Sequence, residues 1–476
     1  MDEFDAAFWP VEKQVSSFAA GEISPVELTE ALLARIGAFD APLHSYLAVT
    51  PELALAQARE AEARYRRESG AAPLPPLLGV AVSIKDLFDV AGVRTTLGCR
   101  LSQGGPAQAD SAVVTRLRRA GAVFLGKTNT AEFGQSATTE NRLGPGCANP
   151  WNPQRTAGGS SGGAAASVAA GLASTALGSD GGGSIRIPAA MCGLFGLKPT
   201  INSVPDDGPF RAMTDFSCPG PIVRRVADAR RFLHAILNHD VGTRDTTARF
   251  RIGWCAAPGD RPIDPAVQAV TDSACSLLGE LGHEVKPISL SFDGWMDAFG
   301  PLVLADEWRL RRHLLDKHVS ELTDYARRAI AAGGRVTPDD LQTARARKDE
   351  FRRRLKSVFD DHHLIVTPST ACAAFPIGTR PRRIDGHPVD PLWGPFPFTA
   401  PINVSGSPAA SVPVGLADGL PVGLQVIGPW HSERALLDAC EQLEEAVGFP
   451  SGEMPRRYAM PLGQLSSPAP KVHVQP

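Results

Sequence analysis

The stretch Ala157–Thr200, AGGSSGGAAASVAAGLASTALGSDGGGSIRIPAAMCGLFGLKPT, decides the fold of this chain. It places two serine-bearing glycine clusters, Gly158–Gly163 and Gly181–Ser184, on either side of a small-residue segment that predicts a packed helix and strand. Apolar residues such as Val168 interrupt the glycines, which argues against a flexible Gly/Ser linker. Backbone N–H groups of both clusters can approach a ligand closely because no Cβ stands in the way.

The composition around this stretch is that of an ordinary globular protein. The chain has 476 residues, of which 43% are hydrophobic and 21% charged, with a formal net charge of −3. That charge gives no basic footprint for nucleic acid. No apolar run reaches the roughly 18 residues of a membrane span, and the acidic start MDEFDAAFWPVEK is unlike a signal peptide. We expect a cytoplasmic protein that binds no nucleic acid and has no membrane span.

Cysteine and histidine spacing gives no sign of a metal. The eight cysteines contain no C-x-x-C pair, and the eleven histidines contain no H-E-x-x-H motif. We expect buried thiols, because a chain of this size can form a core without disulfides. The sequence therefore predicts an activity that uses no metal and no cofactor.

Helix and strand signals alternate along most of the chain. Ser24, Pro25 and Glu27 predict a capped helix start, and a second helix is expected over about 51–67. Leu77–Ile84 predicts a buried strand. The alternation predicts an α/β fold, with a central mixed twisted sheet covered by helices on both faces.

Three parts are expected along the chain. They are an N-terminal helical layer (1–75), an α/β core (76–460) and a mobile polar tail (461–476). Within the core, the region at about 241–360 predicts a βαβ unit and a charged helical hairpin, whose second arm begins after Thr337 and ends near Phe359. The segment Pro205–Pro221 is expected to be irregular.

The second glycine cluster points to acyl transfer. The amides of Gly181–Gly183 form a nest of donors, and Ser184 follows where a carbonyl held in that nest would present its carbon to the hydroxyl. A hydroxyl needs a base, and Lys85 is a candidate because it ends a buried strand, where desolvation lowers its pKa. Taken alone, a lysine at a strand end is more often an ordinary surface residue. Gly158–Gly162 matches the G-x-S-x-G string of α/β-hydrolases, but Asn149–Arg155 cannot form the central strand that this elbow requires.

These residues resemble the amidase signature family, whose serine hydrolases use a Ser–cis-Ser–Lys triad. The resemblance covers nearly the whole chain and implies the fold of that family for the core. Its motifs are Glu22–Ile36, Gly79–Gly92, Gly126–Phe133, Asn149–Pro153, Gly158–Gly163, Gly178–Pro188, Gly193–Thr200 and Leu420–Gly428.

The resemblance implies a role for each triad residue. Ser184 is the acylated nucleophile, and Ser160 is the bridging serine, with a cis peptide between Gly159 and Ser160. Lys85 is the base that accepts a proton from Ser160 while Ser160 takes one from Ser184. The implied oxyanion donors are the amides of Gly181, Gly182, Gly183 and Ser184. The implied structural supports are Asp180, Arg186 and Ser161.

The substrate is an amide-like small molecule of a class that the sequence leaves open. Two segments, Asp206–Pro221 and Asp390–Pro401, carry apolar side chains that suit a pocket for an aryl or alkyl group, although plain core packing explains each side chain as well. Anilides, aromatic or fatty amides, carbamates and esters would fit such a pocket. A homodimer is one assembly state that we consider. The expected substrate contacts are Gly134, Phe210, Met213, Trp393 and Phe396.

The sequence departs from the family pattern at Gly181, where the resemblance predicts Thr or Ile. We therefore expect a looser oxyanion loop with open space beside it.

Two alternatives to a stand-alone amidohydrolase remain. One is the A subunit of a glutaminyl-tRNA amidotransferase, which usually has a glutamine within the motif at Ser184–Pro188 and a Ser-Ser-Leu-Asp-Gln run at Asp215–Pro219. This chain has neither. The other is a catalytically silent binding protein, which the three filled triad positions argue against.

Overall fold

Eleven strands form the central sheet of the computed structural model, which describes residues 6–67, 74–102, 104–207, 212–237, 239–317 and 319–449. They are β1 (Tyr46–Val49), β2 (Ala81–Lys85), β3 (Val123–Thr128), β6 (Thr175–Asp180), β7 (Phe195–Lys198), β8 (Cys218–Val223), β9 (Arg251–Trp254), β10 (Glu284–Pro287), β11 (Leu364–Pro368), β14 (Ala409–Ala417) and β15 (Leu420–Ile427). Their order across the sheet is β1-β3-β2-β6-β8-β7-β14-β15-β11-β9-β10. Neighbours run parallel from β3 to β6 and from β11 to β10, and antiparallel elsewhere, so the predicted mixed sheet is confirmed.

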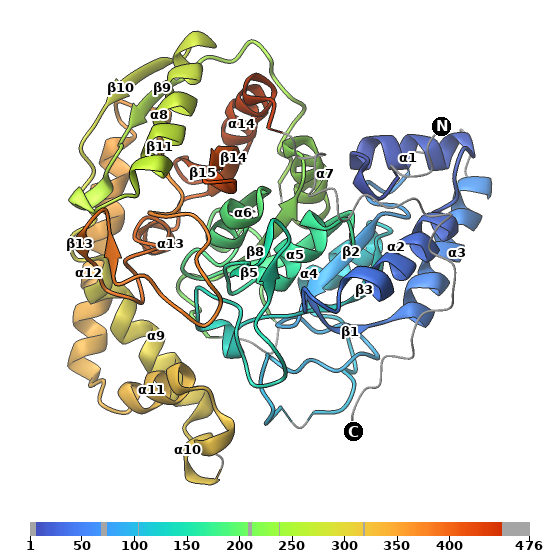
Figure 1. Cartoon of the computed structure of the whole chain (residues 1–476), viewed down its shortest axis with the longest axis horizontal. Helices are drawn as coiled ribbons and strands as arrows, with labels where there is room; N and C mark the ends of the chain where they lie inside the picture. Colours follow the sequence, from blue (N-terminus) through green and yellow to red (C-terminus); the bar gives the residue numbers. More distant parts are fainter. Residues whose placement is uncertain are drawn as a thin grey trace.

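Helices flank this sheet. Figure 1 shows the first three helices gathered at one end of the molecule and the helices between β10 and β11 at the other end. The helices are α1 (Val11–Ala20), α2 (Pro25–Phe39), α3 (Pro51–Arg67), α4 (Ala112–Arg119), α5 (Gly162–Ala169), α6 (Arg186–Cys192), α7 (Val226–Ile236), α8 (Pro265–Glu280), α9 (Trp295–Arg311), α10 (Leu314–Lys317), α11 (Asp324–Gly333), α12 (Pro338–Val358), α13 (Ala400–Ser405) and α14 (Glu433–Val447). Two small antiparallel pairs complete the strands, β4 (Ala148–Asn149) with β5 (Asn152–Thr156) and β12 (Arg383–Ile384) with β13 (His387–Pro388).

The two helix starts that were predicted from capping residues, after Ser24 and after Thr337, are confirmed. Ser24 accepts hydrogen bonds from the amides of Val26 and Glu27, and the Glu27 carboxylate accepts one from the Ser24 amide. Thr337 and Asp340 form the same box at the start of α12. The expected helical layer also contributes a strand that the sequence does not predict, β1, which pairs with β3.

The order of the strands brings the two distant parts of the site to one edge of the sheet. Strand β2 lies between β3 and β6 and is parallel to both, with Ile84 opposite Leu177. Lys85 ends β2, and Asp180 ends β6. Because parallel strands end at the same edge, Lys85 and the loop Gly181–Ser184 lie there together.

One segment that was predicted to be irregular contains the start of a strand instead. The sequence of Pro205–Pro221 predicts an irregular segment, yet β8 begins at Cys218 and pairs with both β6 and β7. Pro219 and Pro221 are two residues apart, so their missing N–H groups lie along one edge of the strand. The amide of Gly220, between the two prolines, points to the other edge and remains available for the ladder there.

Several other expectations can be compared with the described residues. The βαβ unit is present as β9, α8 and β10, with β9 and β10 parallel. All eight cysteines are buried and unpaired. Among the described helices, none combines the length and hydropathy that a membrane crossing requires. The division at residues 75 and 460 stays a prediction, and residues 461–476 lie outside the described ranges.

Candidate active site

Lys85 is fully buried and lies among three serine hydroxyls. Its Nζ is 2.7 Å from Ser160 Oγ, 2.8 Å from Ser161 Oγ and 2.9 Å from Ser179 Oγ. Burial lowers the pKa of Lys85 well below its ordinary value, and the charge of Asp180 opposes this only in part. The site therefore favours the neutral amine.

Ser160 lies in a tight segment that is held by Thr139. The peptide between Gly159 and Ser160 is cis, the form that the resemblance implies. The Thr139 hydroxyl lies 2.9 Å from the Gly158 carbonyl and 3.2 Å from the Ser160 carbonyl, to which it can donate, and it accepts from the Gly162 amide at 2.9 Å. A Cβ at Gly159 would lie 2.5 Å from the backbone of Thr138, so only glycine fits there.

A buried ion pair supports the loop Gly181–Ser184, which we call the serine loop. Asp180 and Arg186 are both fully buried, and Arg186 reaches the two carboxylate oxygens at 2.8 and 2.9 Å. Arg186 also donates to Asn403 Oδ1 at 2.5 Å and to Gln425 Oε1 at 2.6 Å. Burial raises the pKa of Asp180, but the charge and hydrogen bonds of Arg186 outweigh it and hold that pKa well below its ordinary value. The carboxylate therefore stays ionised.

One peptide of the serine loop is held at both ends. The Gly183 amide donates to Asp180 Oδ1 at 2.7 Å, and the Gly182 carbonyl accepts from Thr399 Oγ1 at 2.9 Å. Gly183, which the resemblance implies as an oxyanion donor, thus has its N–H occupied by Asp180, and this corrects that expectation. Within the described ranges, the amides of the other three loop residues donate no hydrogen bond, which leaves them for a ligand oxygen.

A cavity of about 1120 Å³ opens beside the serine loop, with Gly182 and Ser184 in its wall. Ser184 is 9% exposed, whereas Lys85 and Ser160 are 0% and 1% exposed. The Ser161 amide donates to the Ser184 carbonyl at 3.1 Å, which joins the two glycine clusters. Of these three side chains, that of Ser184 is therefore the one that faces a molecule in the cavity.

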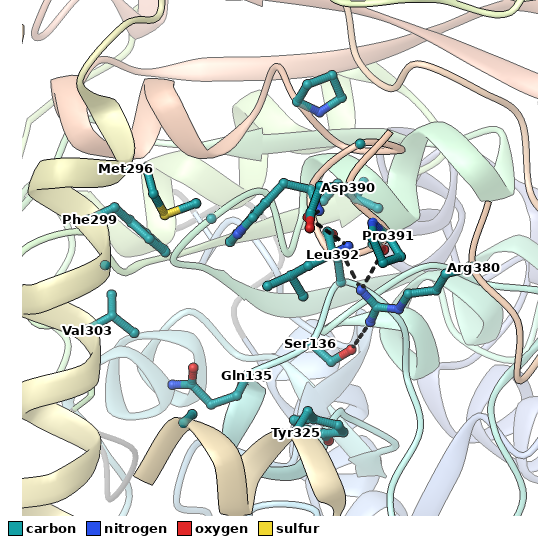
Figure 2. A pocket seen from close by; sticks show the side chains of 18 of the residues that line it. Gln135, Ser136, Met296, Phe299, Val303, Tyr325, Arg380, Asp390, Pro391 and Leu392 are labelled. Carbon is teal, nitrogen blue, oxygen red and sulfur yellow. Dashed lines mark hydrogen bonds between the residues drawn. The ribbon is translucent and has the colours of Figure 1, made fainter. Parts of the chain in front are cut away.

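The cavity has one apolar wall and one polar wall. Figure 2 shows Phe299 of α9 on one side and Gln135, Ser136 and Arg380 across from it. Arg380 Nη2 donates to Ser136 Oγ at 2.6 Å. Gln135 Nε2 donates to the buried carboxylate of Glu307 at 2.6 Å. The amide oxygen of Gln135 takes no part in that hydrogen bond. Such a cavity suits a molecule with an apolar body and a polar amide.

Three of the expected substrate contacts, Gly134, Met213 and Trp393, line this cavity. Trp393 packs edge-on against Trp295 and Phe299, with ring centroids 5.2 and 5.6 Å apart. This aromatic cluster forms the apolar wall next to the serine loop.

The prediction for Phe396 is wrong. Its side chain is fully buried, packs against Phe375 and is not among the residues that line the cavity. Trp393 lines the cavity whereas Phe396, three residues later, lies in the core, and the sequence alone does not distinguish the two environments. Phe210, the remaining expected contact, lies outside the described residues.

The open space that we expected beside Gly181 is also absent from the structure. A Cβ at this position would lie 2.5 Å from Sδ of Met213. The methionine side chain fills that space, and it comes from a loop about 30 residues further along the chain, which explains why the local sequence did not predict it.

Sequence reasoning missed five polar residues that hold the site together. Thr399, Asn403 and Gln425 are buried polar side chains between apolar or small neighbours, as in the run LPVGLQVIG that contains Gln425, and that contrast could have indicated them. Thr139 and Ser179 have polar neighbours, and no local signal marks them. The five are Thr139, Ser179, Thr399, Asn403 and Gln425. Across the described ranges, no group of three or more His, Cys, Asp and Glu side chains is placed to hold a metal ion.

Comparison with known proteins agrees with this geometry. The family model described as Amidase matches residues 27–437. A putative amidase, AmiB2 of Mycobacterium tuberculosis (strain CDC 1551 / Oshkosh), is 37% identical over 94% of this chain and 98% of its own length. The A subunit of the glutamyl-tRNA(Gln) amidotransferase of Chloroflexus aggregans is 36% identical over 89% of this chain and 93% of its own length.

The solved structures include a bacterial aryl acylamidase described as one of the amidase signature enzymes. It superposes with a TM-score of 0.84 at 29% identity, covering 95% of this chain and 98% of the other. The similarity in fold therefore extends over nearly the whole chain.

Proposed function

The chain belongs to the amidase family and is an amidohydrolase that acts on carbon–nitrogen bonds, and we propose that it does so through an acyl-enzyme on Ser184. The observation that carries this proposal is the 2.7 Å contact between Lys85 Nζ and Ser160 Oγ, adjacent to the one serine of the triad that lines the cavity. A serine hydroxyl becomes a nucleophile when such a base removes its proton.

The hydroxyls around Lys85 support a direction for proton transfer. Ser161 Oγ donates to the Ser179 carbonyl at 3.2 Å, so it accepts from Lys85. A neutral Lys85 has two N–H donors, which go to Ser161 and Ser179, and one lone pair, which then faces Ser160. Lys85 takes the proton of Ser160 while Ser160 takes that of Ser184.

Catalysis then proceeds in two half-reactions. Ser184 Oγ attacks the carbonyl carbon, and the amides of Gly181, Gly182 and Ser184 donate to the oxyanion. Ser160 gives its proton to the leaving amine and regains one from Lys85, so the amine is neutralised, Lys85 is again a base, and the acyl group stays on Ser184. Water repeats the sequence and releases the acid, so the proposed route uses no metal and no cofactor.

We propose amides with an aryl or alkyl group as substrates. The aromatic wall of Trp295, Phe299 and Trp393 beside the serine loop supports such a group. The likeness to an aryl acylamidase structure agrees with that class. Carbamates and esters need the same acyl chemistry and belong to the same proposal.

The amidotransferase is the second candidate because curated relatives carry that name. Its reaction would need glutamine as ammonia donor and further subunits as partners. Against it stand Ser184–Pro188 and Asp215–Pro219, where the glutamine and the Ser-Ser-Leu-Asp-Gln run of those proteins are missing. As finer proposals, we infer a cytoplasmic enzyme with no nucleic-acid partner and consider a homodimer.

An amine-release screen tests the proposed function. Small amides, anilides, fatty amides and carbamates are incubated with the native chain, with Ser184→Ala and with Ser273→Ala, which makes the same chemical change on the exposed face of α8. Release of amine or ammonia by the native chain and by Ser273→Ala, but not by Ser184→Ala, is expected. If the native chain released ammonia only from glutamine in the presence of Glu-tRNA, the transferase would replace the proposed amidohydrolase.

A further inference from the structure

The side chain of Met213 occupies the place that a side chain at position 181 would take. A Cβ on Gly181 would lie 2.5 Å from Met213 Sδ, 3.4 Å from its Cβ and 3.6 Å from its Cγ. The nearest of these atoms belongs to the thioether, the flexible part of the side chain. A larger residue at 181 would therefore have to displace Met213.

The backbone of Met213 is fixed, although its side chain is flexible. Its carbonyl accepts hydrogen bonds from the amides of Phe216 and Ser217, both at 2.8 Å, in the turn before β8. Strand β8 in turn places Cys218 opposite Asp180, the residue before the serine loop. The ladder between β6 and β8 thus keeps Met213 next to Gly181.

Displaced from Gly181, the Met213 thioether has room to move on the side of the cavity. Met213 is 8% exposed and already lines the cavity with Gly182 and Ser184. In the same cavity wall, a Cβ at Gly182 would lie 3.2 Å from Trp393 and 3.4 Å from Phe299, so these rings pack close to the loop. The width available beside Ser184 is therefore bounded by aromatic rings on one side and by one methionine on the other.

We propose that Met213 is a specificity-determining residue that replaces the missing side chain of position 181 and sets the width of the substrate space beside Ser184. An unbranched thioether has three rotatable bonds and adapts to neighbours of different shape. The class of substrate is therefore amides whose acyl group varies in width, from straight alkyl to flat aryl. The inference rests on Ser184 as nucleophile, as in the proposed function.

Sulfonyl fluorides test the inference because each carries a single organic group. Ser184 Oγ forms a bond to sulfur, fluoride leaves, and the hydroxyl proton passes to the base. The rate of this reaction is measured by intact mass with a narrow reagent, methanesulfonyl fluoride, and a wide one, phenylmethanesulfonyl fluoride. The variants are Gly181→Ala, Met213→Ala and the double variant, each with a thermal unfolding curve to verify that it folds.

We expect Gly181→Ala to slow the wide reagent about tenfold relative to the narrow one, because its Cβ pushes the thioether into the cavity. The double variant should return the ratio of the two rates to within about twofold of the native value. Met213→Ala alone should raise the relative rate of the wide reagent.

Two results would overturn the inference. One is an equal loss with both reagents in Gly181→Ala that the second substitution does not reverse, which would mean that the Cβ acts on the loop itself. The other is an unchanged ratio in all variants. Absence of any adduct on the native chain is a separate outcome that removes the proposed function, and with it the basis of this inference.

Discussion

The hydroxyl of Thr399 donates a hydrogen bond to the carbonyl oxygen of Gly182 at 2.9 Å, across 217 residues of sequence. The amide at the other end of the same peptide, that of Gly183, donates to Asp180 at 2.7 Å. Together the two bonds fix one peptide plane of the serine loop. The remaining amides of the loop therefore keep their direction toward the cavity.

Replacing Thr399 by valine should lower kcat by about tenfold to a hundredfold, with little change in KM. Valine keeps the shape of the side chain and loses the hydroxyl, so the loop amides lose their fixed direction while the cavity wall is unaltered. Thr399→Ser restores the hydroxyl and should recover most of kcat. Steady-state kinetics on one amide measure all three proteins. An equal loss in both variants, or a change in KM alone, would contradict the positioning role.

Replacing Lys85 by alanine should reduce turnover by about a thousandfold or more, because both serines lose their base. In the native enzyme, activity should rise with pH as the lysine loses its proton, since only the neutral amine accepts one. Burial lowers the pKa of Lys85, so this rise should occur below the range of an ordinary lysine. The pH profile of kcat/KM provides the measurement. Native-like turnover of Lys85→Ala, or a rise of kcat/KM only in the range of an ordinary lysine, would argue against a buried lysine base.

Asp228 predicts a pH dependence of stability that is independent of catalysis. Its carboxylate is buried and accepts a hydrogen bond from the Val11 amide at 2.8 Å. Burial raises its pKa from 3.8 to about 6, and the charge of Arg224 opposes this only in part. The folded state therefore binds a proton more tightly than the unfolded chain. The resulting stability is complete below about pH 4 and is lost as the pH rises through about 6.

Denaturant unfolding between pH 4 and 7 measures this effect. The contribution of Asp228 amounts to at most about 3 kcal/mol, from the size of its pKa shift. Asp228→Asn keeps an acceptor for Val11 and does not titrate, so its unfolding free energy should depend less steeply on pH than that of the native chain. Identical slopes for the two proteins would assign the pH dependence to other groups.

Local features of the fold were predictable from the sequence. The cap residues Ser24 and Thr337 satisfy nearby amides, so a few adjacent residues specify these helix starts. Strand β8 was missed for the opposite reason. Its prolines argue locally against a strand, and the pairing with β6 and β7 that overrides them is visible only in the fold.

In the active site too, local patterns were predictable from the sequence and contacts between distant segments were not. The glycine clusters predict where backbone donors gather, but Lys85 is recognisable as their partner only through the family resemblance, because the strand order that joins them is not local. Thr399 and Met213 reach the serine loop from distant segments, and no spacing in the sequence indicates those contacts. Trp393 and Phe396 are similar in sequence context, and only packing separates a cavity wall from the core.

The identity of the nucleophile is the central claim, and mass spectrometry after treatment with a serine-reactive sulfonyl fluoride tests it most directly. The native chain and Ser184→Ala are treated in parallel and analysed as intact proteins, and the labelled native chain is then digested to locate the adduct. We predict one adduct on the native chain, located on Ser184, and none on Ser184→Ala. An unlabelled native chain, or an adduct that persists in Ser184→Ala, would contradict the account.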